Sequence, residues 1–411
     1  MARVPVRALT LGVAEPHPLP PEVLESSAAS LFDIADEVRA AGYDVQTVRF
    51  STRPMLSDLA AWGGSAVLSY TADLQRRLDA FGIRFCSLGP ALPNVAPGRA
   101  ELLAEVIAGN PALSGSVMVA TSEGGLDMRA VRAAARTMVR LGKQTSEGLG
   151  NFNFAALACV APGGPFFPAS YQGVATGRGA RGLPATGAAP TITLALQGAG
   201  VIAAALEGGA ELHDVTERVR DALLSAAGPV ASLVEDAAAE LGVAWGGTDL
   251  SPAPNGRDSI GAAMEQAGLG MLGSPGTLAL AAAITAGIQG TTLLTCGYNG
   301  LMLPVMEDAV LAERWAQGAV GLDQLLAYSA VCGTGLDMVP FPGDSRADDL
   351  VGTICDVASL ALRLHKPLSA RLLPAPGKAA GDQTSFSSPY VVNTTVRPLR
   401  SAAEQSGKHP Q

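Results

Sequence analysis

Short segments that are β-branched or continuously apolar recur from one end of the chain to the other. Such segments are typical of strands that are covered on both faces of a sheet. Ten of them are predicted as strands: Val6–Val13, Val45–Phe50, Ile83–Leu88, Ser116–Thr121, Phe154–Val160, Thr191–Leu196, Val243–Asp249, Thr291–Cys296, Leu336–Phe341 and Ala370–Leu373.

The segments between these strands often have helical periodicity. Glu22–Ala41 begins after a proline pair, ends before Gly42 and has apolar residues at helical spacing, as helix boundaries predict. Asp127–Leu141 and Ala347–Leu364 have the same pattern, and Asp214–Leu241 is a longer helical region. The alternation of strand and helix predicts an α/β fold with a largely parallel sheet.

The chain has no polar linker that would separate two halves. We therefore expect a single α/β barrel domain over residues 1–396, followed by a polar, disordered tail over residues 397–411. Gly173–Pro190 is rich in glycine. A loop of this length inside a compact domain is either an active-site cover or a flexible insert, and both interpretations stay open.

Composition narrows the class of protein. Glycine and proline contribute 48 and 28 of the 411 residues, and charged residues make up 16%, against roughly 25% in an average soluble domain. This predicts many turns around a mostly buried sheet. The formal net charge is −9, so the basic surface typical of nucleic-acid binding is not expected.

The five cysteines are widely spaced and include no CxxC pair. This pattern argues against a disulfide scaffold or zinc ribbon and favours reduced thiols in the cytoplasm. The most apolar region, Thr277–Pro304, is interrupted by several glycines and does not predict a membrane span. The apolar stretch Ala8–Ala14 is interpreted as a strand and not as a secretory peptide. A homo-oligomer is compatible with this sequence.

Acidic residues end or follow several apolar segments, among them Asp249, Asp337, Asp344 and Glu307. Side chains at the carboxyl ends of barrel strands line active sites, so Asp249, Asp337 and Glu307 are candidate catalytic acids or bases. Asp249, Asp337 and Asp344 would also suit a hard cation such as Mg²⁺ or Ca²⁺. The alternative for Asp344 is an N-cap of the helix Ala347–Leu364.

Gly198 and Gly200 have the spacing G-x-G-x-x-A between the strand Thr191–Leu196 and a helix. This spacing occurs in dinucleotide-binding folds, but the second strand with a terminal acid does not follow, and no nicotinamide or flavin is expected. Free N–H groups at this helix start could still hold a substrate carboxylate or phosphate. Tight packing of helix against strand is the alternative role of the two glycines.

Four further residues are candidates for catalysis or substrate binding, and each also has a purely structural alternative. Cys332 could be a nucleophile at a helix N-terminus, or a buried free cysteine. His17 could be a general acid or base, or an exposed loop histidine. Ser122 and Ser251 could bind substrate, or cap the helices that follow.

Arg371 and Lys378 are isolated basic residues in an otherwise apolar segment. Because an unpaired buried charge is costly, a paired or substrate-facing role is predicted for both. They are candidates for binding the anionic end of a substrate, with Arg371 making two parallel hydrogen bonds to a carboxylate.

Several separate motifs occur in the second two-thirds of the chain. They are Gly125-Leu126-Asp127-Met128, Thr248-Asp249-Leu250-Ser251-Pro252-Ala253-Pro254, Pro304-Val305-Met306-Glu307-Asp308, Val331-Cys332-Gly333-Thr334-Gly335-Leu336-Asp337-Met338, Pro342-Gly343-Asp344, Pro376-Gly377-Lys378 and Gly381-Asp382. In this order they resemble the DUF711 family, also called UPF0210 and described as PFL-like (pyruvate formate-lyase-like), over about residues 115–396. The first hundred residues match only loosely.

The resemblance implies a ten-stranded α/β barrel like the core of the glycyl-radical enzymes. It does not imply a radical, because Val396-Arg397-Pro398-Leu399-Arg400 stands where the radical glycine would be, and no two cysteines are adjacent. The resemblance brings no established activity.

Together these features predict a lyase or hydrolase that acts on a small carbonyl- or carboxylate-bearing metabolite. Carboxylates led by Asp249 and Asp337 would act as acid and base or hold a divalent cation, and Gly173–Pro190 would close over the mouth of the barrel. Secondary metabolism is as conceivable a setting as housekeeping metabolism. The alternative is a non-catalytic small-molecule binding or regulatory protein.

Overall fold

The computed structural model describes residues 3–173 and 189–398. One ten-stranded sheet collects strands from almost the whole described chain. Its strands are β1 (Val6–Gly12), β2 (Val48–Ser51), β3 (Cys86–Ala91), β4 (Leu113–Thr121), β5 (Gly125–Leu126), β6 (Phe154–Ala158), β7 (Thr191–Leu196), β8 (Ala244–Asp249), β9 (Gly335–Pro342) and β10 (Leu368–Ala375). The α/β prediction is confirmed.

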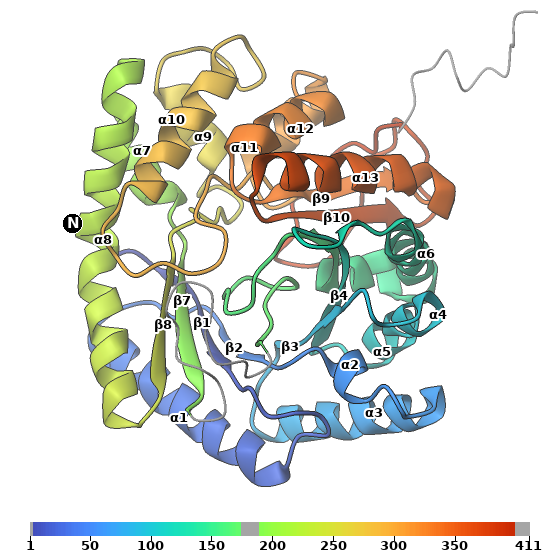
Figure 1. Ribbon diagram of the computed structural model, residues 1–411. Helices are drawn as coiled ribbons and strands as arrows, with labels where there is room; N and C mark the ends of the chain where they lie inside the picture. Colours follow the sequence, from blue (N-terminus) through green and yellow to red (C-terminus); the bar gives the residue numbers. More distant parts are fainter. Residues whose placement is uncertain (1–2, 174–188, 399–411) are drawn as a thin grey trace, which may run out of the picture.

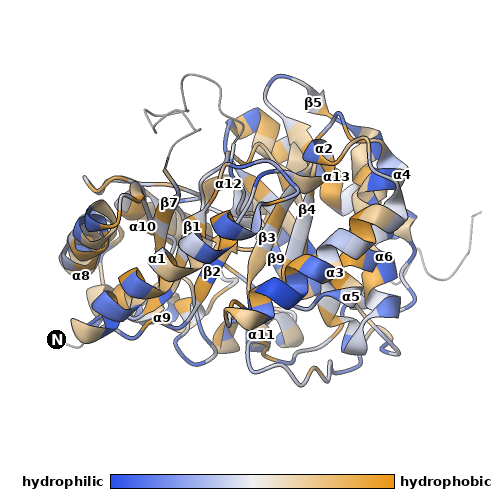
Figure 2. Ribbon diagram, turned by 90° about the horizontal axis from the view of Figure 1, so that it is seen from below, coloured by the Kyte–Doolittle hydropathy of each residue, from blue (hydrophilic) through white to orange (hydrophobic). Residues whose placement is uncertain are grey.

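Helices surround the sheet on its outer side, as Figure 1 shows. They are α1 (Pro21–Ala40), α2 (Met55–Asp58), α3 (Gly64–Ala80), α4 (Pro97–Ala100), α5 (Leu103–Gly109), α6 (Met128–Gln144), the 3₁₀ segment η1 (Ser146–Asn153), α7 (Ala199–Leu206), α8 (Leu212–Glu240), α9 (Ile260–Gln266), α10 (Thr277–Gln289), α11 (Ala309–Gln317), α12 (Leu322–Val331) and α13 (Ala347–Leu364). In Figure 2 the helices α1, α3 and α6 carry both hydrophilic and hydrophobic residues, as helices with one buried face must.

The strand order is β8-β7-β1-β2-β3-β4-β6-β10-β9, with β5 paired to β4. Strands β1, β2, β3, β4 and β6 are parallel to their neighbours in this group. The pairs β7–β8 and β9–β10 are each parallel internally, and they join the larger group through antiparallel contacts with β1 and β6. The sheet is therefore largely parallel, with two antiparallel joins.

The two edge strands, β8 and β9, are not paired with each other, so the predicted barrel is not confirmed. The chain between them makes only isolated bridges, from Thr295 to Thr248 of β8 and from Pro304 to Asp337 of β9. Glycine permits this close approach, since a Cβ on Gly300 would lie 2.4 Å from the Cα of Gly333. The predicted strand Thr291–Cys296 is accordingly not a regular strand.

The other nine predicted strands each overlap an observed one, with ends shifted by up to three residues. The short strand β5 was not predicted. Helix α1 starts at the proline pair and stops before Gly42, whose φ of +86° lies in the left-handed region that glycine tolerates. Asp127 caps α6 by accepting hydrogen bonds from Arg129 N and Ala130 N.

The N-cap alternative for Asp344 is wrong. Helix α13 starts later, with Arg346 as its N-cap, and Asp349 Oδ2 accepts from the Arg346 N–H at 2.8 Å. The physical reason is that the turn Pro342–Ser345 comes first, because the Ser345 N–H bonds back to the Pro342 carbonyl.

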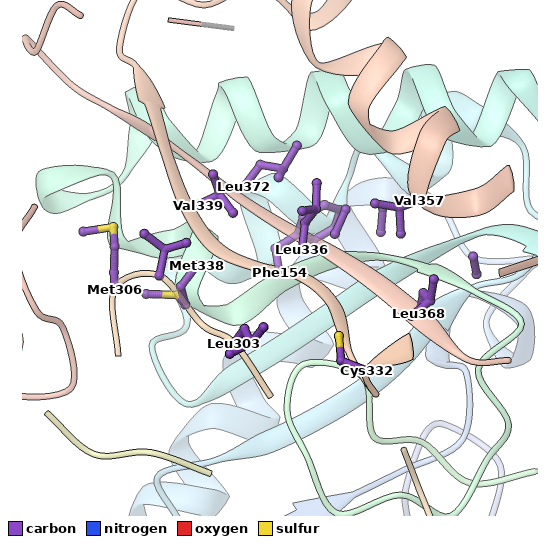
Figure 3. Packing of buried hydrophobic residues seen from close by; sticks show 14 of the residues in the cluster. Phe154, Leu303, Met306, Cys332, Leu336, Met338, Val339, Val357, Leu368 and Leu372 are labelled. Atoms are coloured by element: carbon purple, nitrogen blue, oxygen red, sulfur yellow. The ribbon is translucent and has the colours of Figure 1, made fainter. Parts of the chain in front are cut away.

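The core between β9, β10 and α13 is apolar. Figure 3 shows Phe154, Leu336, Val357 and Leu372 packed together there. Helix α8 alone among the described helices is long and apolar enough to cross a membrane, but one of its faces is buried, including Val219, Leu223 and Val230. A buried face is typical of a core helix.

Residues 159–172, which follow β6, lie inside the curve of the sheet (green in the centre of Figure 1). Phe166 packs against Ala8 and Ala195, and Tyr171 against Met118 and Leu157. The backbone of this loop also bonds to the surrounding strands, at Thr10 Oγ1, Ser87 Oγ and Thr52 O. The loop thus fills part of the space inside the curved sheet. Most of the predicted covering loop Gly173–Pro190 lies outside the described residues.

Candidate functional site

A cavity of about 60 Å³ lies inside the curve of the sheet, against Phe166 and Phe167 of the interior loop. This is several times the 10–15 Å³ that about one water needs. Its charged lining residues are Arg7 on β1, Arg49 on β2, Asp337 on β9, Arg371 on β10 and Glu307. All five are at most 8% exposed. We call this cavity the arginine pocket.

Arg371 holds both carboxylates of the arginine pocket. Its Nε lies 2.6 Å from Asp337 Oδ1, and its Nη2 lies 2.7 Å from Glu307 Oε1. Glu307 also pairs with Arg7, with 3.6 Å between Oε2 and Nη2. Burial by itself would lower the pKa of Arg371, but Asp337 and Glu307 outweigh burial and raise it. The predicted paired role of Arg371 is therefore observed.

Irregularities in the sheet occur where the charged residues lie. The register between β10 and β9 shifts between Ala370 and Leu372, on either side of Arg371. The register between β1 and β7 shifts around Arg7 in the same way. Bulges re-aim side chains and are frequent near functional sites. Here they let a charged residue in an apolar strand face the cavity.

Arg49 differs from the other two arginines because no carboxylate pairs with it among the described residues. Its Nε donates to Thr47 Oγ1 at 3.0 Å. Its guanidinium carbon lies over the rings of Phe85 and Phe167, 5.5 and 5.4 Å from their centroids. Burial, and then the charge of Arg7, lowers the Arg49 pKa to about 9. A buried cation held only by one hydroxyl and two ring faces is left with positive charge to neutralise.

Aromatic residues gather at the arginine pocket although they form only 5% of the chain. Tyr390 stacks on Phe152 and meets Phe85 edge-on, and Tyr390 is 40% exposed, which places it at the rim. Two buried hydroxyls of the lining, on Tyr298 and Thr334, make no hydrogen bond of normal geometry within residues 3–173 and 189–398. Unsatisfied buried hydroxyls beside a cavity are suited to a polar ligand atom.

Asp249 lies behind the arginine pocket and does not line it. Its carboxylate is fully buried and accepts from Tyr298 N at 2.7 Å, Asn299 N at 3.1 Å and the Ser251 hydroxyl at 2.7 Å. Burial raises the Asp249 pKa, and these hydrogen bonds oppose the shift. In this geometry Asp249 holds the turn that carries Tyr298 into the pocket.

The structure does not gather the three predicted metal ligands. Asp249 is behind the arginine pocket, Asp337 is in it and Asp344 is exposed outside it. Among residues 3–173 and 189–398, no three His, Cys, Asp or Glu side chains lie close enough together to hold a metal ion.

Gly198 and Gly200 mark the start of α7, but this helix end already has an anion. The Asp258 carboxylate accepts from the Gly200 N–H and from Gln197 Nε2. A Cβ on Gly198 would lie 3.0 Å from the Pro252 Cα. The packing alternative therefore describes Gly198, and Gly200 binds a carboxylate of its own chain.

The remaining predicted residues lie away from the arginine pocket. Cys332 is buried among apolar side chains (Figure 3), and burial raises its pKa, which disfavours the thiolate. Ser251 is buried on Asp249, Ser122 is exposed, and Lys378 is half-buried without lining the cavity.

His17 is buried, so the alternative of an exposed loop histidine is wrong. Its Nδ1 lies 2.7 Å from the Tyr70 hydroxyl and its Nε2 lies 2.9 Å from Thr52 Oγ1. Burial lowers the His17 pKa to about 3. The ring is therefore neutral at pH 7, and it joins β1 to α3 and β2.

His17 should make stability depend on pH. Its pKa is about 3 in the folded protein, against 6.5 for a free histidine, so below pH 6.5 the unfolded chain binds the extra proton. The contribution of His17 to the free energy of unfolding is fully present above pH 6.5. It is lost as the pH falls toward 3, by at most about 1.4 kcal/mol per pH unit. His17→Gln should remove this component of the slope in urea unfolding measured from pH 7 to 4. His213→Gln is the control, because His213 is exposed; equal slopes for wild type and H17Q would contradict the assignment.

Sequence reasoning found Glu307, Asp337 and Arg371 and missed Arg7, Arg49 and the aromatic rim. A signal for the arginines existed. Arg7 stands between Val6 and Ala8, and Arg49 between Val48 and Phe50, the same isolated charge in an apolar strand that singled out Arg371. The rim residue Tyr390 lies outside any strand or helix, and nothing in its neighbourhood distinguishes it.

The fold and the site define an α/β protein with a buried, arginine-rich pocket inside a curled ten-stranded sheet. The model of the family described as "Uncharacterised ACR (DUF711)" matches residues 2–389. The chain belongs to this family. The match includes the first hundred residues, beyond the range that the motifs indicated.

Similar proteins carry the family's other name. A UPF0210 protein of Pyrobaculum aerophilum is 34% identical over 380 residues, which cover 88% of this chain and 80% of the relative. One from Pyrobaculum arsenaticum is 33% identical and one from Methanopyrus kandleri 31%, covering 92% and 93% of this chain and 86% and 88% of the relatives. None of these three names states an activity.

Proposed function

We propose that the arginine pocket binds a small metabolite with a carboxylate or carbonyl group, and that the chain is an enzyme that converts it by acid/base chemistry of the lyase or hydrolase kind. The observation that carries this proposal is Arg49, a buried guanidinium that lacks a carboxylate partner among the described residues. A ligand carboxylate would supply the missing charge and could accept two parallel hydrogen bonds. Arg371, the earlier candidate for this role, is occupied by Glu307 and Asp337.

Asp337 is the base in this proposal. Its Oδ1 is bound to Arg371, and no hydrogen bond to its Oδ2 is found within the described residues. Proton transfer needs a carboxylate oxygen that is free and fixed in direction, and the bond to Arg371 fixes it. Burial raises the Tyr298 pKa, so its hydroxyl stays neutral and can donate to a ligand oxygen.

The non-catalytic alternative has one observation in its favour. Both carboxylates of the pocket are ion-paired with the same arginine, and an arrangement whose only purpose is to hold Arg371 in place would look the same. A binding or regulatory protein would be stabilised by ligand without forming product.

Asp337→Asn separates the two functions. Small carboxylates, oxo acids and hydroxy acids that raise the melting temperature of the wild type are incubated with it, and products are identified by mass spectrometry. With an enzyme, D337N should lower turnover by at least about 100-fold, the scale of general base catalysis. Asp344→Asn, exposed and outside the pocket, should leave turnover unchanged. Full turnover by D337N would remove Asp337 from the mechanism, and ligands without any product would favour the binding protein.

Three further expectations accompany this proposal. We place the protein in the cytoplasm, which suits its five free cysteines. We regard the curled sheet, with residues 295–304 between its edges, as a relative of the barrel of glycyl-radical enzymes without the radical. Assistance by Mg²⁺ or Ca²⁺ stays a prediction, which melting after chelation with and without each cation would test.

A further inference from the structure

The charges that face the arginine pocket do not balance. Among the described residues, the lining contains three arginines, Arg7, Arg49 and Arg371, and two carboxylates, Glu307 and Asp337, so one positive charge is in excess. The excess is localised, because Arg7 and Arg371 contact carboxylates and Arg49 does not. A ligand that neutralises the pocket carries one negative charge.

The position of the two carboxylates further restricts the charge that a ligand can carry. Glu307 and Asp337 lie on one guanidinium, within 2.7 Å of its nitrogens, and both line the same small cavity as Arg49. A second anionic group of a ligand bound to Arg49 would therefore enter a buried space in which Arg7 and Arg371 are already paired with the two carboxylates, and its own charge would stay unpaired. An unpaired charge in a buried site is costly, and the nearby carboxylates repel a further anion.

The rest of the wall is apolar or neutral. Phe152, Phe166 and Met302 are among its apolar residues, and its neutral polar groups include the unpartnered hydroxyls of Tyr298 and Thr334. These groups can solvate a hydrocarbon chain and a neutral oxygen, but they offer no second cation for another carboxylate. The composition of the wall and the balance of charges therefore both favour a ligand with a single negative charge.

We propose that the arginine pocket selects monocarboxylates and rejects dicarboxylates of the same length. This inference rests on the proposed function, since it specifies the charge of the ligand that Arg49 binds. Selection arises from two features of the described residues together: Arg49 supplies an unpaired positive charge, and Glu307 and Asp337 already occupy Arg7 and Arg371, so that a second negative charge would meet carboxylates and no free cation.

The test compares butanoate with butanedioate, and benzoate with benzene-1,2-dicarboxylate, on the purified full-length protein. Calorimetry at constant ionic strength gives each Kd, because salt would otherwise screen the difference. We expect each monoanion to bind at least about tenfold more tightly than its dianion. The monomethyl ester of butanedioate, with one charge and the same chain, should bind like butanoate. A dianion that binds as tightly as its monoanion would overturn the inference.

Two variants show whether the cluster is responsible. Glu307→Gln leaves the pocket with one more positive charge, so butanedioate should gain at least about tenfold relative to butanoate. Glu265→Gln is the matched control, because Glu265 also pairs with an arginine, Arg314, but lies outside the pocket; it should leave the ratio unchanged. An unchanged ratio in a folded E307Q contradicts the inference, and the ester comparison decides it if that variant does not fold.

The outcomes also separate this inference from the proposed function. If none of these anions, nor any oxo or hydroxy acid, binds at millimolar concentration, the proposed function itself fails. If carboxylates bind through Arg49 but without preference for one charge, the proposed function stands and the selection is wrong.

Discussion

Replacing Arg49 by methionine is expected to abolish carboxylate binding while the free protein stays at least as stable as the wild type. Binding should weaken by at least about 30-fold, because removal of one partner from a buried, hydrogen-bonded charge pair costs about 2–5 kcal/mol. Stability should not fall, since Arg49 has no carboxylate partner among the described residues and methionine fills a similar apolar volume. Calorimetric titration with butanoate and urea unfolding measure the two quantities.

This combination distinguishes a binding residue from a structural one. A structural arginine would lose stability on replacement, and binding would fail only because the protein unfolds. Arg397→Met is the control, because Arg397 also lies over an aromatic ring, that of Trp315, but outside the pocket. Unchanged butanoate affinity in R49M would refute the role of Arg49, and a large loss of stability would show that its charge is satisfied in the free protein.

Arg371→Met is expected to destabilise the protein by about 3–5 kcal/mol, because the loss of one partner leaves buried charges unpaired. Two carboxylates, on Glu307 and Asp337, lose their closest cation in a site where they are at most 8% exposed. Glu307 keeps only its longer contact with Arg7, at 3.6 Å. Urea unfolding at pH 7 measures the loss.

A variant of a more exposed ion pair is the control for this prediction. Arg314→Met removes a partly exposed pair with Glu265, and it should cost no more than about 1 kcal/mol. A deficit for R371M as small as that would mean that the buried cluster contributes little to the fold.

Local sequence patterns predicted most of the secondary structure. Apolar runs such as Thr191–Leu196 and Val243–Asp249 are strands because they are covered on both faces, and proline and glycine set the ends of α1. The prediction was wrong at Thr291–Cys296, which makes a single bridge to β8. The composition of this segment is that of a strand, but glycines at 290, 297 and 300 and the contact with Gly333 direct its path.

Only some residues of the candidate site were predicted from the sequence. A charge inside an apolar strand is a local signal, and it identified Arg371; the same signal at Arg7 and Arg49 was not used. Asp249 shows the limit of a local pattern, because an acid at a strand end has the same pattern whether it faces a cavity or holds a turn. Its bonds to Tyr298 N and Asn299 N come from residues about fifty positions away, and spacing along the chain does not reveal them.

The sequence by itself determined that this protein is a largely parallel α/β fold with few charges, and that some of these charges lie inside apolar strands. Only the tertiary structure decided which of them meet. The interior loop 159–172 occupies part of the space inside the sheet, and bulges at Arg7 and Arg371 turn these side chains toward the remaining cavity. Arg7 and Arg371 then pair with carboxylates and Arg49 does not, among the described residues. The sequence could not show this, because ion pairing depends on distances in space and not on order along the chain.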